Sequence, residues 1–303
     1  MIIAFCRRGD SSQTLGRRLR AKLFAAGAAL LAVSVPAQAS DATRQAYHER
    51  SLILAANARC QLFRADVEQA LQAAALQTRG VLLRSGVETS VVGAIAARAR
   101  SEANGLSCSD PDLQTRANRI IHAFDRWGRA ARVEFPANQH SWRVDRFQRN
   151  ETGWRMVQDS RVGRSPVRFG LAGPSPAQVR PMVVVSFQGQ ARPYAARLVM
   201  RDTRALPRPH AVENGLAAMP PFAARQMVLA ASREQAPASL LAEGQRRGDA
   251  WVFGPEIMGQ LTRLDPREPF WIEFLFRDDS IARVTFEAGD AAAARTFLSL
   301  GGV

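Results

Sequence analysis

An apolar segment close to the N-terminus, Leu23–Ala39, determines how much of this chain is available to fold. It ends in Ala37-Gln38-Ala39 and follows four basic residues, Arg17, Arg18, Arg20 and Lys22. A basic flank, a short apolar core and an A-x-A exit are typical of a cleavable secretory signal. We therefore predict that residues 1–39 are a signal peptide. The mature protein would begin near Ser40 and be periplasmic or secreted.

Two other interpretations of this segment remain open. An uncleaved anchor needs about 20 apolar residues to span a bilayer, whereas this run is shorter and contains Pro36. A twin-arginine signal would use Arg17-Arg18, although Arg20 stands where that motif has an apolar residue. No cysteine lies at the predicted cleavage point, which disfavours a lipoprotein. We predict no transmembrane span after cleavage.

Export would leave two cysteines, Cys60 and Cys108, in an oxidising compartment, because Cys6 is removed with the signal. Two thiols in such a compartment are expected to form a disulfide. In the loop-entropy treatment, closing a loop of about 49 residues stabilises the folded chain by about 4 kcal/mol. The alternatives are a metal pair or a reactive thiol. Neither has a second Cys or His at ligand spacing.

The charge of the chain is basic, and its source matters for the choice of partner. The full chain has 41 basic and 27 acidic residues, of which the first 39 residues hold six and one. The mature chain therefore has 35 basic residues, all of them arginine, against 26 acidic ones, a net charge of +9. The arginines are scattered, without the run of like charges typical of a nucleic-acid-binding segment. We exclude nucleic acid and retain an envelope protein or an anionic envelope polymer as the partner.

Residues 40–134 have helical periodicity, and we predict a small disulfide-stapled helical domain there. One helix is expected from about Thr43 to Ala58, a second from Ala65 towards Gly86, and a third that stops at Asn104-Gly105. The fourth has the clearest start, because Asp110 can cap free N–H groups and Pro111 fits the first helical position. Its predicted apolar stripe is Leu113, Ala117, Ile120, Ile121, Phe124 and Trp127.

A row of arginines lies opposite that stripe, at Arg119, Arg126 and Arg129. The row has two interpretations, a docking face or the solvated back of an amphipathic helix. We favour the solvated back, because charged outer faces are the rule on such helices.

Residues 135–303 are predicted to form an antiparallel β-sandwich-like domain with a C-terminal helix, giving an α+β chain. The clearest hairpin is expected from Met182–Phe187 and Tyr194–Arg201, because the second arm alternates apolar and partly charged residues. Further strands are predicted at Val167–Leu171 and Gln226–Ser232. The proline-rich stretch between them, Leu206–Phe222, is predicted to be a loop.

The C-terminal part has a distinct order of elements. A short helix at Glu256–Leu264 is followed by strands at Phe270–Arg277 and Ile281–Glu287, and by a helix that Asp290 would cap. One strand face should be buried, and it carries Phe270, Ile272, Phe274 and Phe276.

This order resembles the tail of the invasion-associated locus B family of secreted bacterial proteins. The resemblance covers about 45 residues at Glu256–Leu298. The matching residues are Leu261, Leu264, Asp278, Asp279, Ala292, Ala293, Phe297 and Leu298. A cysteine-stapled helical region before a β region is also similar to uncharacterised secreted proteins of alphaproteobacteria. The resemblance implies an envelope location and a non-enzymatic role, and it assigns no site residues.

No catalytic constellation is recognisable in the sequence. The four histidines, His48, His122, His140 and His210, form no metal motif, and we expect His122 to be a partly buried structural residue. No G-x-S-x-G occurs, and neither Gly153 nor Gly163 opens a phosphate-binding turn. Asp278 and Asp279 share a turn and would point apart, while Glu287 and Asp290 suit a capping arrangement. We predict no catalytic residue, metal ligand or cofactor.

Aromatic and basic residues cluster around the start of the β region. Tryptophan and arginine are enriched at binding hot spots, so one interpretation is a binding face at Trp142, Arg146, Trp154 and Arg155. Tryptophan also fills sheet cores, and we favour a core position for these rings. Any binding face is expected where this edge of the sheet meets the helical domain.

Two functional hypotheses follow. The leading one is an exported, non-enzymatic envelope protein that binds a partner or supports an assembly. The alternative is an exported hydrolase with its site between the two domains, near His210 and covered by residues 206–222. A third and weaker hypothesis is electrostatic binding to anionic envelope polymers.

Overall fold

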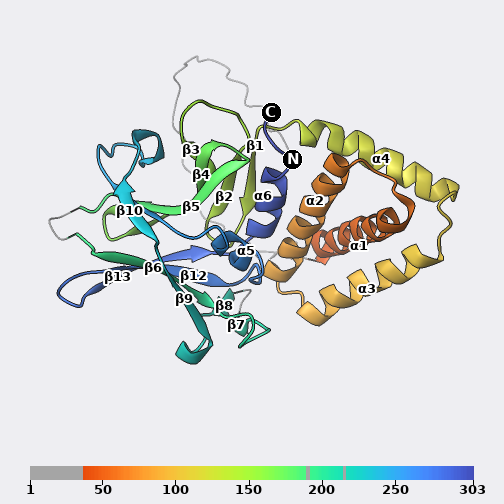
Figure 1. The fold of residues 1–303 in the computed structure, drawn as a ribbon. Helices are drawn as coiled ribbons and strands as arrows, with labels where there is room; N and C mark the ends of the chain where they lie inside the picture. The colour runs from red at the N-terminus through yellow and green to blue at the C-terminus, as the bar shows by residue number, and fades with distance from the viewer. Residues whose placement is uncertain (1–36, 189–191, 214–215) are drawn as a thin grey trace, which may run out of the picture. The chain divides into compact units, whose positions relative to one another are not determined.

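The structure is a computed structural model that describes residues 37–188, 192–213 and 216–303. Residues 1–36, and with them most of the predicted signal peptide, lie outside these ranges. The described chain begins with four helices and continues with antiparallel strands (Figure 1). This order confirms the predicted mixture of an N-terminal helical region and a sheet region. The described residues, from Ala37 onwards, form one compact unit.

The helices are α1 (Ala37–Cys60), α2 (Ala65–Arg84), α3 (Thr89–Gly105) and α4 (Pro111–Gly128). The predicted start of α4 is confirmed, because the Leu113 N–H donates to the Asp110 carboxylate at 2.9 Å and Pro111 occupies the first turn. Helix α2 ends in a Schellman motif around Gly86, whose φ is +89°. There the Gly86 N–H donates to Leu83 O and the Val87 N–H to Leu82 O, each at 3.0 Å.

A disulfide joins Cys60, the last residue of α1, to Cys108, just before α4. The S–S distance is 2.02 Å and the Cα atoms are 5.4 Å apart, which confirms the predicted pair. Within the bundle, Leu113 and Ala117 of α4 are buried as expected. Ile121 is not, since 36% of it is exposed, so the predicted stripe is wrong at this position. The reason is that α4 extends past the bundle core towards the strands, where Ile121 borders a cavity.

Two antiparallel sheets contain most of the strands. The seven-stranded sheet has the order β1 (Arg132–Pro136), β2 (Ser141–Asp145), β3 (Gly153–Val162), β4 (Ser165–Ser175), β5 (Gln178–Val185), β11 (Asp249–Val252), β10 (Ser232–Gln235). The four-stranded sheet has the order β13 (Ile281–Glu287), β12 (Pro269–Leu275), β6 (Ala195–Arg201), β9 (Arg225–Leu229). A short pair is formed by β7 (His210–Glu213) and β8 (Leu216–Ala218).

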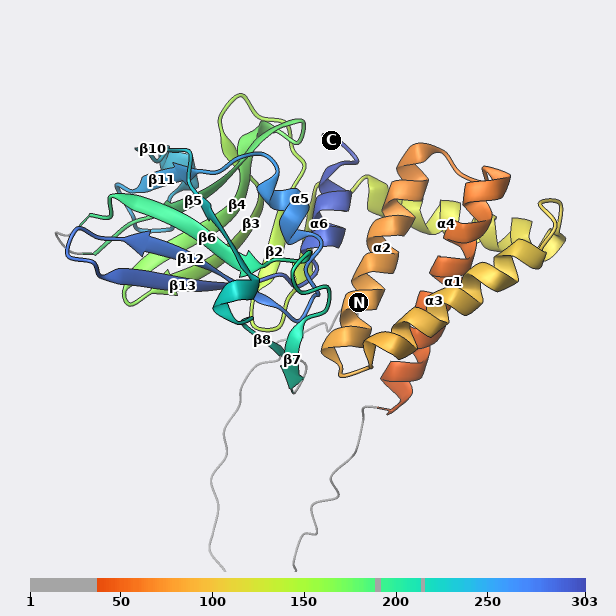
Figure 2. The same ribbon diagram turned by 60° about the horizontal axis from the view of Figure 1, so that its bottom comes forward.

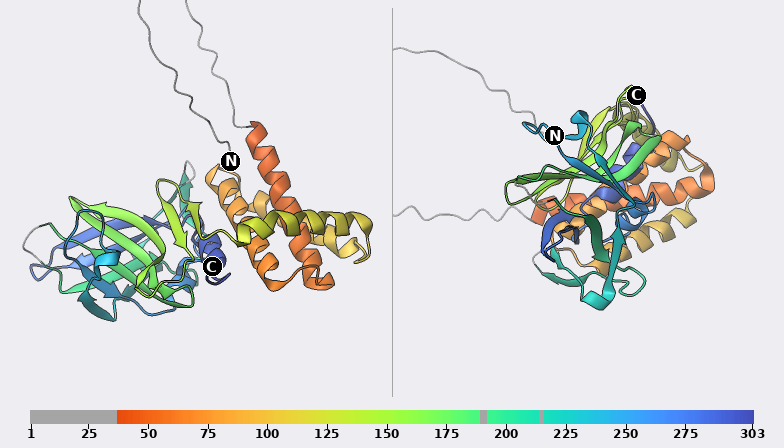
Figure 3. Two further views of the ribbon diagram at one scale, coloured as in Figure 1. Left: turned by 90° about the horizontal axis from the view of Figure 1, so that it is seen from above. Right: turned by 60° about the vertical axis from the view of Figure 1, so that its left-hand side comes forward.

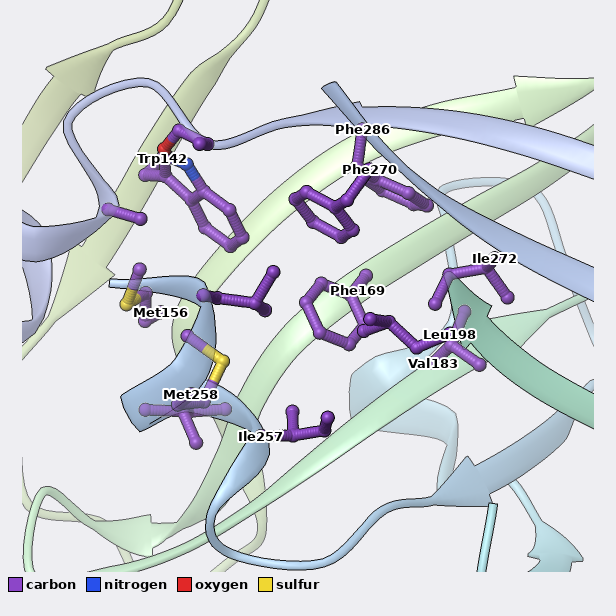
Figure 4. Packing of buried hydrophobic residues seen from close by; sticks show 14 of the residues in the cluster. Trp142, Met156, Phe169, Val183, Leu198, Ile257, Met258, Phe270, Ile272 and Phe286 are labelled. Atoms are coloured by element: carbon purple, nitrogen blue, oxygen red, sulfur yellow. Dashed lines mark hydrogen bonds between the residues drawn. The ribbon is translucent and has the colours of Figure 1, made fainter. Parts of the chain in front are cut away.

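Side chains from both sheets meet in one hydrophobic core (Figure 4). Phe169 of β4 contacts Phe270 of β12 and Phe286 of β13, with ring centroids 5.3 and 5.7 Å apart. Phe270, Ile272 and Phe274 are fully buried, as predicted from their shared strand face, and Phe276 is partly buried against the core. The core is completed by α5 (Ile257–Leu261) and α6 (Ala291–Leu298), which confirm the two predicted C-terminal helices.

The predicted hairpin between residues 182–187 and 194–201 is wrong. Both segments contain strands, but β5 lies between β4 and β11, whereas β6 lies between β12 and β9 in the other sheet. Strand β5 is covered on both faces, because Val183 and Val185 enter the shared core while Met182 and Val184 pack beside Leu240 of η2 (Ala238–Leu240). Strand β5 therefore pairs with the strand before it, β4, and on its other edge with the distant β11 rather than with β6.

Three further expectations need correction. Residues 226–232, predicted as one strand, belong to β9 and β10 in different sheets. Residues 206–222, predicted as a loop, contain β7 and β8, which precede η1 (Phe222–Ala224). Strand β1 begins at Arg132, within the predicted helical domain of residues 40–134, and ends at Pro136. Proline is tolerated there because β1 is an edge strand.

Helix α6 lies between the strands and the N-terminal helices, where it packs against α2 (Figures 1 and 3). Asp290 stands at its N-terminal cap position, but its carboxylate makes no capping bond. It instead accepts two hydrogen bonds from Arg84 of α2, so the predicted capping role is wrong. No helix in the described part of the chain combines the length and apolarity that crossing a membrane requires.

Candidate functional site

Arg146 follows directly on β2 and lies where the strands meet the helices. Its side chain is held by the backbone: Nε donates to Gly301 O at 2.7 Å, and Nη1 donates to Gly128 O at 2.7 Å and to Ala130 O at 3.2 Å. The guanidinium also lies over the Phe297 ring, 4.9 Å from its centroid. These contacts fix the group between the end of α4, the start of β1 and the C-terminal residues.

Arg146 differs from the other buried arginines in its charge partner. Arg201, Arg267 and Arg155 each have a carboxylate within 4.0 Å, supplied by Glu268, Asp265 and Asp145. Arg146 is only 3% exposed, yet no carboxylate lies within 4.0 Å of it among the described residues. Burial lowers its pKa from the ordinary arginine value. A buried cation without an opposite charge is costly, so an arrangement that keeps one calls for an explanation.

A cavity of about 480 Å³ adjoins this guanidinium. Its apolar lining comes from four separate parts of the chain, and consists of Leu62, Val67, Ile121, Phe124 and Leu300. Arg146 contributes a polar wall together with Gly128. In Figure 1 the C-terminus lies beside the end of α4, which brings Leu300 close to that helix. We call this the Arg146 cavity.

The rim of the Arg146 cavity carries two ion pairs that neutralise themselves. Arg64 Nη2 lies 2.8 Å from Asp66 Oδ2, and Arg129 donates to Asp125 one turn earlier in α4. The hydrogen bond from Arg64 lowers the pKa of Asp66, so its carboxylate remains charged. One positive charge, that of Arg146, is therefore left over in the lining.

The other three residues of the predicted binding face lie elsewhere. Trp142 is fully buried in the shared core, where its indole N–H donates to the carbonyls of Glu287 and Ala288 (Figure 4). Arg155 is 1% exposed and donates to Gly173 O at 2.9 Å, with Asp145 3.8 Å away. The half-buried Trp154 donates to Leu240 O at 3.0 Å. The structure brings Arg146 alone of these four to the Arg146 cavity.

The arginine row of α4 is engaged in local pairs where its side chains are described. Arg129 pairs with Asp125, and Arg119 lies 3.9 Å from Glu49. The side chain of Arg126 lies outside the described residues. These exposed pairs contribute little energy and are consistent with a solvated helix back.

Two histidines lie near a carboxylate, with His48 Nε2 3.2 Å from Glu102 Oε2 and His140 Nδ1 3.9 Å from Glu287 Oε1. His210, on which the hydrolase hypothesis depends, makes no side-chain hydrogen bond to a described Ser, Asp or Glu. His122 is exposed, so the expected partly buried position is wrong; its helix face points away from the bundle core. Glu287 accepts the backbone N–H groups of residues 138–140 and so closes a turn.

A second cavity, of about 700 Å³, is lined by residues of the α2–α3 connection and of the segment 208–212. Figure 2 shows the α2–α3 connection near β7. Its charged lining includes Arg84, Arg208 and Arg267. Two of these are neutralised, since Arg84 pairs with Asp290 and Arg267 with Asp265. His210 does not line it, so residues 206–222 cover no acid–base pair there.

No three His, Cys, Asp or Glu side chains in the described ranges lie close enough to hold a metal ion. Comparison of the chain with family models, curated proteins and solved structures gives no match. The predicted resemblance to the invasion-associated locus B family therefore stays a prediction.

Sequence reasoning found Arg146 but missed the rest of the cavity. Leu62, Ile121 and Leu300 are far apart in the chain, and no periodicity links them. The one available signal was the apolar stripe of α4, which continues beyond the residues that the bundle core buries.

Proposed function

We propose that this chain is an exported, non-enzymatic envelope protein that binds a ligand in the Arg146 cavity. In this proposal the signal peptide is removed near Ser40, and the two sheets pack as a β-sandwich behind the disulfide-stapled helices. The predicted resemblance of Glu256–Leu298 to the locus B family supports an envelope location.

The observation that carries the binding role is the unpaired buried guanidinium in a partly apolar cavity. Ligand sites are typically clefts of roughly 300–1,000 Å³ that combine apolar walls with placed polar groups. The Arg146 cavity has this size, and its lining combines five apolar residues with five charged ones and Gly128. A ligand of opposite charge would remove the cost of burying Arg146 uncompensated. Binding is favoured over catalysis because the two carboxylates of the lining, Asp66 and Asp125, are each paired with an arginine.

The Cys60–Cys108 bond supports the exported location, since disulfides persist in oxidising compartments and are rare in the cytosol. The test is to express the full chain in a bacterial host, fractionate the cells and determine the N-terminus and thiol state by mass spectrometry. The proposal expects a periplasmic protein that begins near Ser40 and has no free thiol. Uncleaved protein in the cytosol with both thiols free would contradict it.

A further inference from the structure

The free donors of Arg146 define what the cavity can bind. Nε and Nη1 are used by backbone carbonyls, whereas Nη2 makes no hydrogen bond to any described residue. Nη2 is also not among the described polar atoms that are sealed from solvent without a partner. Because Arg146 lines the cavity, the two Nη2 N–H groups are available to a molecule that enters it.

The charge of the cavity lining determines whether an anion or a cation binds more favourably. Each rim carboxylate, Asp66 and Asp125, is matched by its own arginine, so neither balances Arg146. An anion is therefore favoured over a cation.

The apolar side chains of the cavity determine the chemistry of the uncharged part of the ligand. Leu62, Phe124 and Leu300 are partly buried around the cavity, and Ile121 is 36% exposed. An inorganic anion would leave these side chains in contact with water, whereas a hydrocarbon chain would cover them. A ligand that contacts both Arg146 and these apolar side chains has one charged end and one apolar end.

We propose that the Arg146 cavity binds a small anionic amphiphile, with its carboxylate or phosphate head at Arg146 Nη2 and its alkyl chain against Ile121 and Phe124. This inference rests on the proposed function and names the ligand class for the same site. A carboxylate and a phosphate offer the same oxygen acceptors to a guanidinium, so their two sources are separated by experiment.

The first test is isothermal titration calorimetry on the protein purified after expression of the full chain. The probes are straight-chain carboxylates and alkyl phosphates of four to twelve carbons, with the matching alcohols and alkyltrimethylammonium salts as controls. Affinity is expected to rise about fourfold for each methylene buried, until the cavity is filled. Carboxylate or phosphate should bind about 10- to 100-fold more tightly than the alcohol of equal length. The better head group identifies the source, a fatty acid or an alkyl phosphate.

The second test uses variants at an exposed lining position, which spares the fold. Ile121→Glu and Ile121→Lys both remove an apolar contact with the alkyl chain and should weaken binding of the neutral alcohol equally. Ile121→Glu also adds a negative charge to the cavity lining, so it should bind the anion about tenfold or more weakly than Ile121→Lys does. Arg146→Met should abolish the preference for the anion over the alcohol, while Arg164→Met, at an exposed turn, should retain it. If Arg146→Met does not fold, as judged by circular dichroism, the comparison of Ile121→Glu with Ile121→Lys tests the proposal by itself.

Three outcomes overturn the ligand class: no preference for the anion, an equal effect of Glu and Lys at position 121, or binding without dependence on chain length. These outcomes are distinguishable from a failure of the proposed function. If the chain is exported and processed but binds none of the alkyl compounds, the envelope role stands and the amphiphile proposal is wrong. If the chain stays uncleaved in the cytosol, the proposed envelope role is wrong, whichever compounds the protein binds.

Discussion

Arg84 in the last turn of α2 and Asp290 at the start of α6 form a buried, two-point ion pair across 206 residues of sequence. The Nη1–Oδ1 and Nη2–Oδ2 distances are 2.5 and 3.0 Å, and the Asp290 side chain is fully buried. This pair joins the helical region to the sheet region. It makes the packing of α2 on α6 specific, because each charge is costly without the other.

Arg84→Met should destabilise the protein by about 3–5 kcal/mol, because it leaves Asp290 as an uncompensated buried carboxylate. The double variant Arg84→Met/Asp290→Ala should lose less than Arg84→Met alone. Urea unfolding of the two single variants and the double variant measures the coupling. A double variant whose loss equals the sum of the two single losses would show that the pair does not act as a unit.

The same pair predicts a pH dependence. Burial raises the pKa of Asp290, and the hydrogen bonds from Arg84 oppose that effect without reversing it. A carboxyl whose folded pKa lies above its unfolded value contributes stability below the unfolded pKa, and this is lost as pH rises through the folded pKa. The deficit of Arg84→Met should therefore shrink as pH falls towards the acidic range. A deficit that stays constant with pH, measured by urea unfolding, would contradict this account.

Glu273 should show the opposite dependence. Burial raises its pKa, but hydrogen bonds from Arg197 and Arg283, at 2.7 and 2.8 Å, outweigh burial and leave the pKa lowered. A lowered pKa contributes stability above the unfolded value, and this is lost as pH falls through the folded pKa. Glu273→Gln should be less stable than the wild type at neutral pH and should approach it in acid. Parallel pH profiles of the two proteins would be inconsistent with this assignment.

Gly80 allows α2 to approach α6 closely. A Cβ added at Gly80 would lie 1.9 Å from the Asp290 Oδ1 atom, which the ion pair holds in place. Gly80→Ala should therefore destabilise by about 1–3 kcal/mol through overpacking. The matched control is Gly93→Ala on the exposed side of α3, where a Cβ meets nothing within 4 Å. It should stabilise by about 0.5–1 kcal/mol through helix propensity. Thermal unfolding of both variants checks the difference in sign.

The Cys60–Cys108 bond should be a large contribution to the stability of the helical region. Its 48-residue separation predicts a loss of about 4 kcal/mol when both cysteines are replaced by alanine. Helical signal should be lost before the sheet signal in circular dichroism of the variant. A variant as stable as the wild type would show that the packing of α1 on α2 and α3 suffices without the bond.

Local signals in the sequence predicted the parts of the fold that depend on a few neighbouring residues. Asp110-Pro111 marked the start of α4, and the turn at Asp278-Asp279 separated β12 from β13, with Asp279 at a φ of +62°. Each needs only a cap or a turn residue, so the chemistry is visible within a short window.

Choices between distant partners were not predictable in this way. The alternation in residues 194–201 shows that β6 has a more polar face, but it does not say that β12 is its neighbour rather than β5. The role of Asp290 likewise depended on Arg84, which no local rule connects to it. The Arg146 cavity has the same origin, since its lining is assembled only when the C-terminal residues meet α4.

The central claim, that Arg146 is a binding group, is tested most directly by its own NMR signal. The Nε–Hε resonances of the arginines separate in a two-dimensional spectrum, and Arg146→Lys assigns the one in question. Titration with the tightest-binding alkyl anion should shift the Arg146 resonance in step with the calorimetric isotherm and leave that of the buried, ion-paired Arg155 unmoved. Saturation of the protein with no shift at Arg146 would contradict the account.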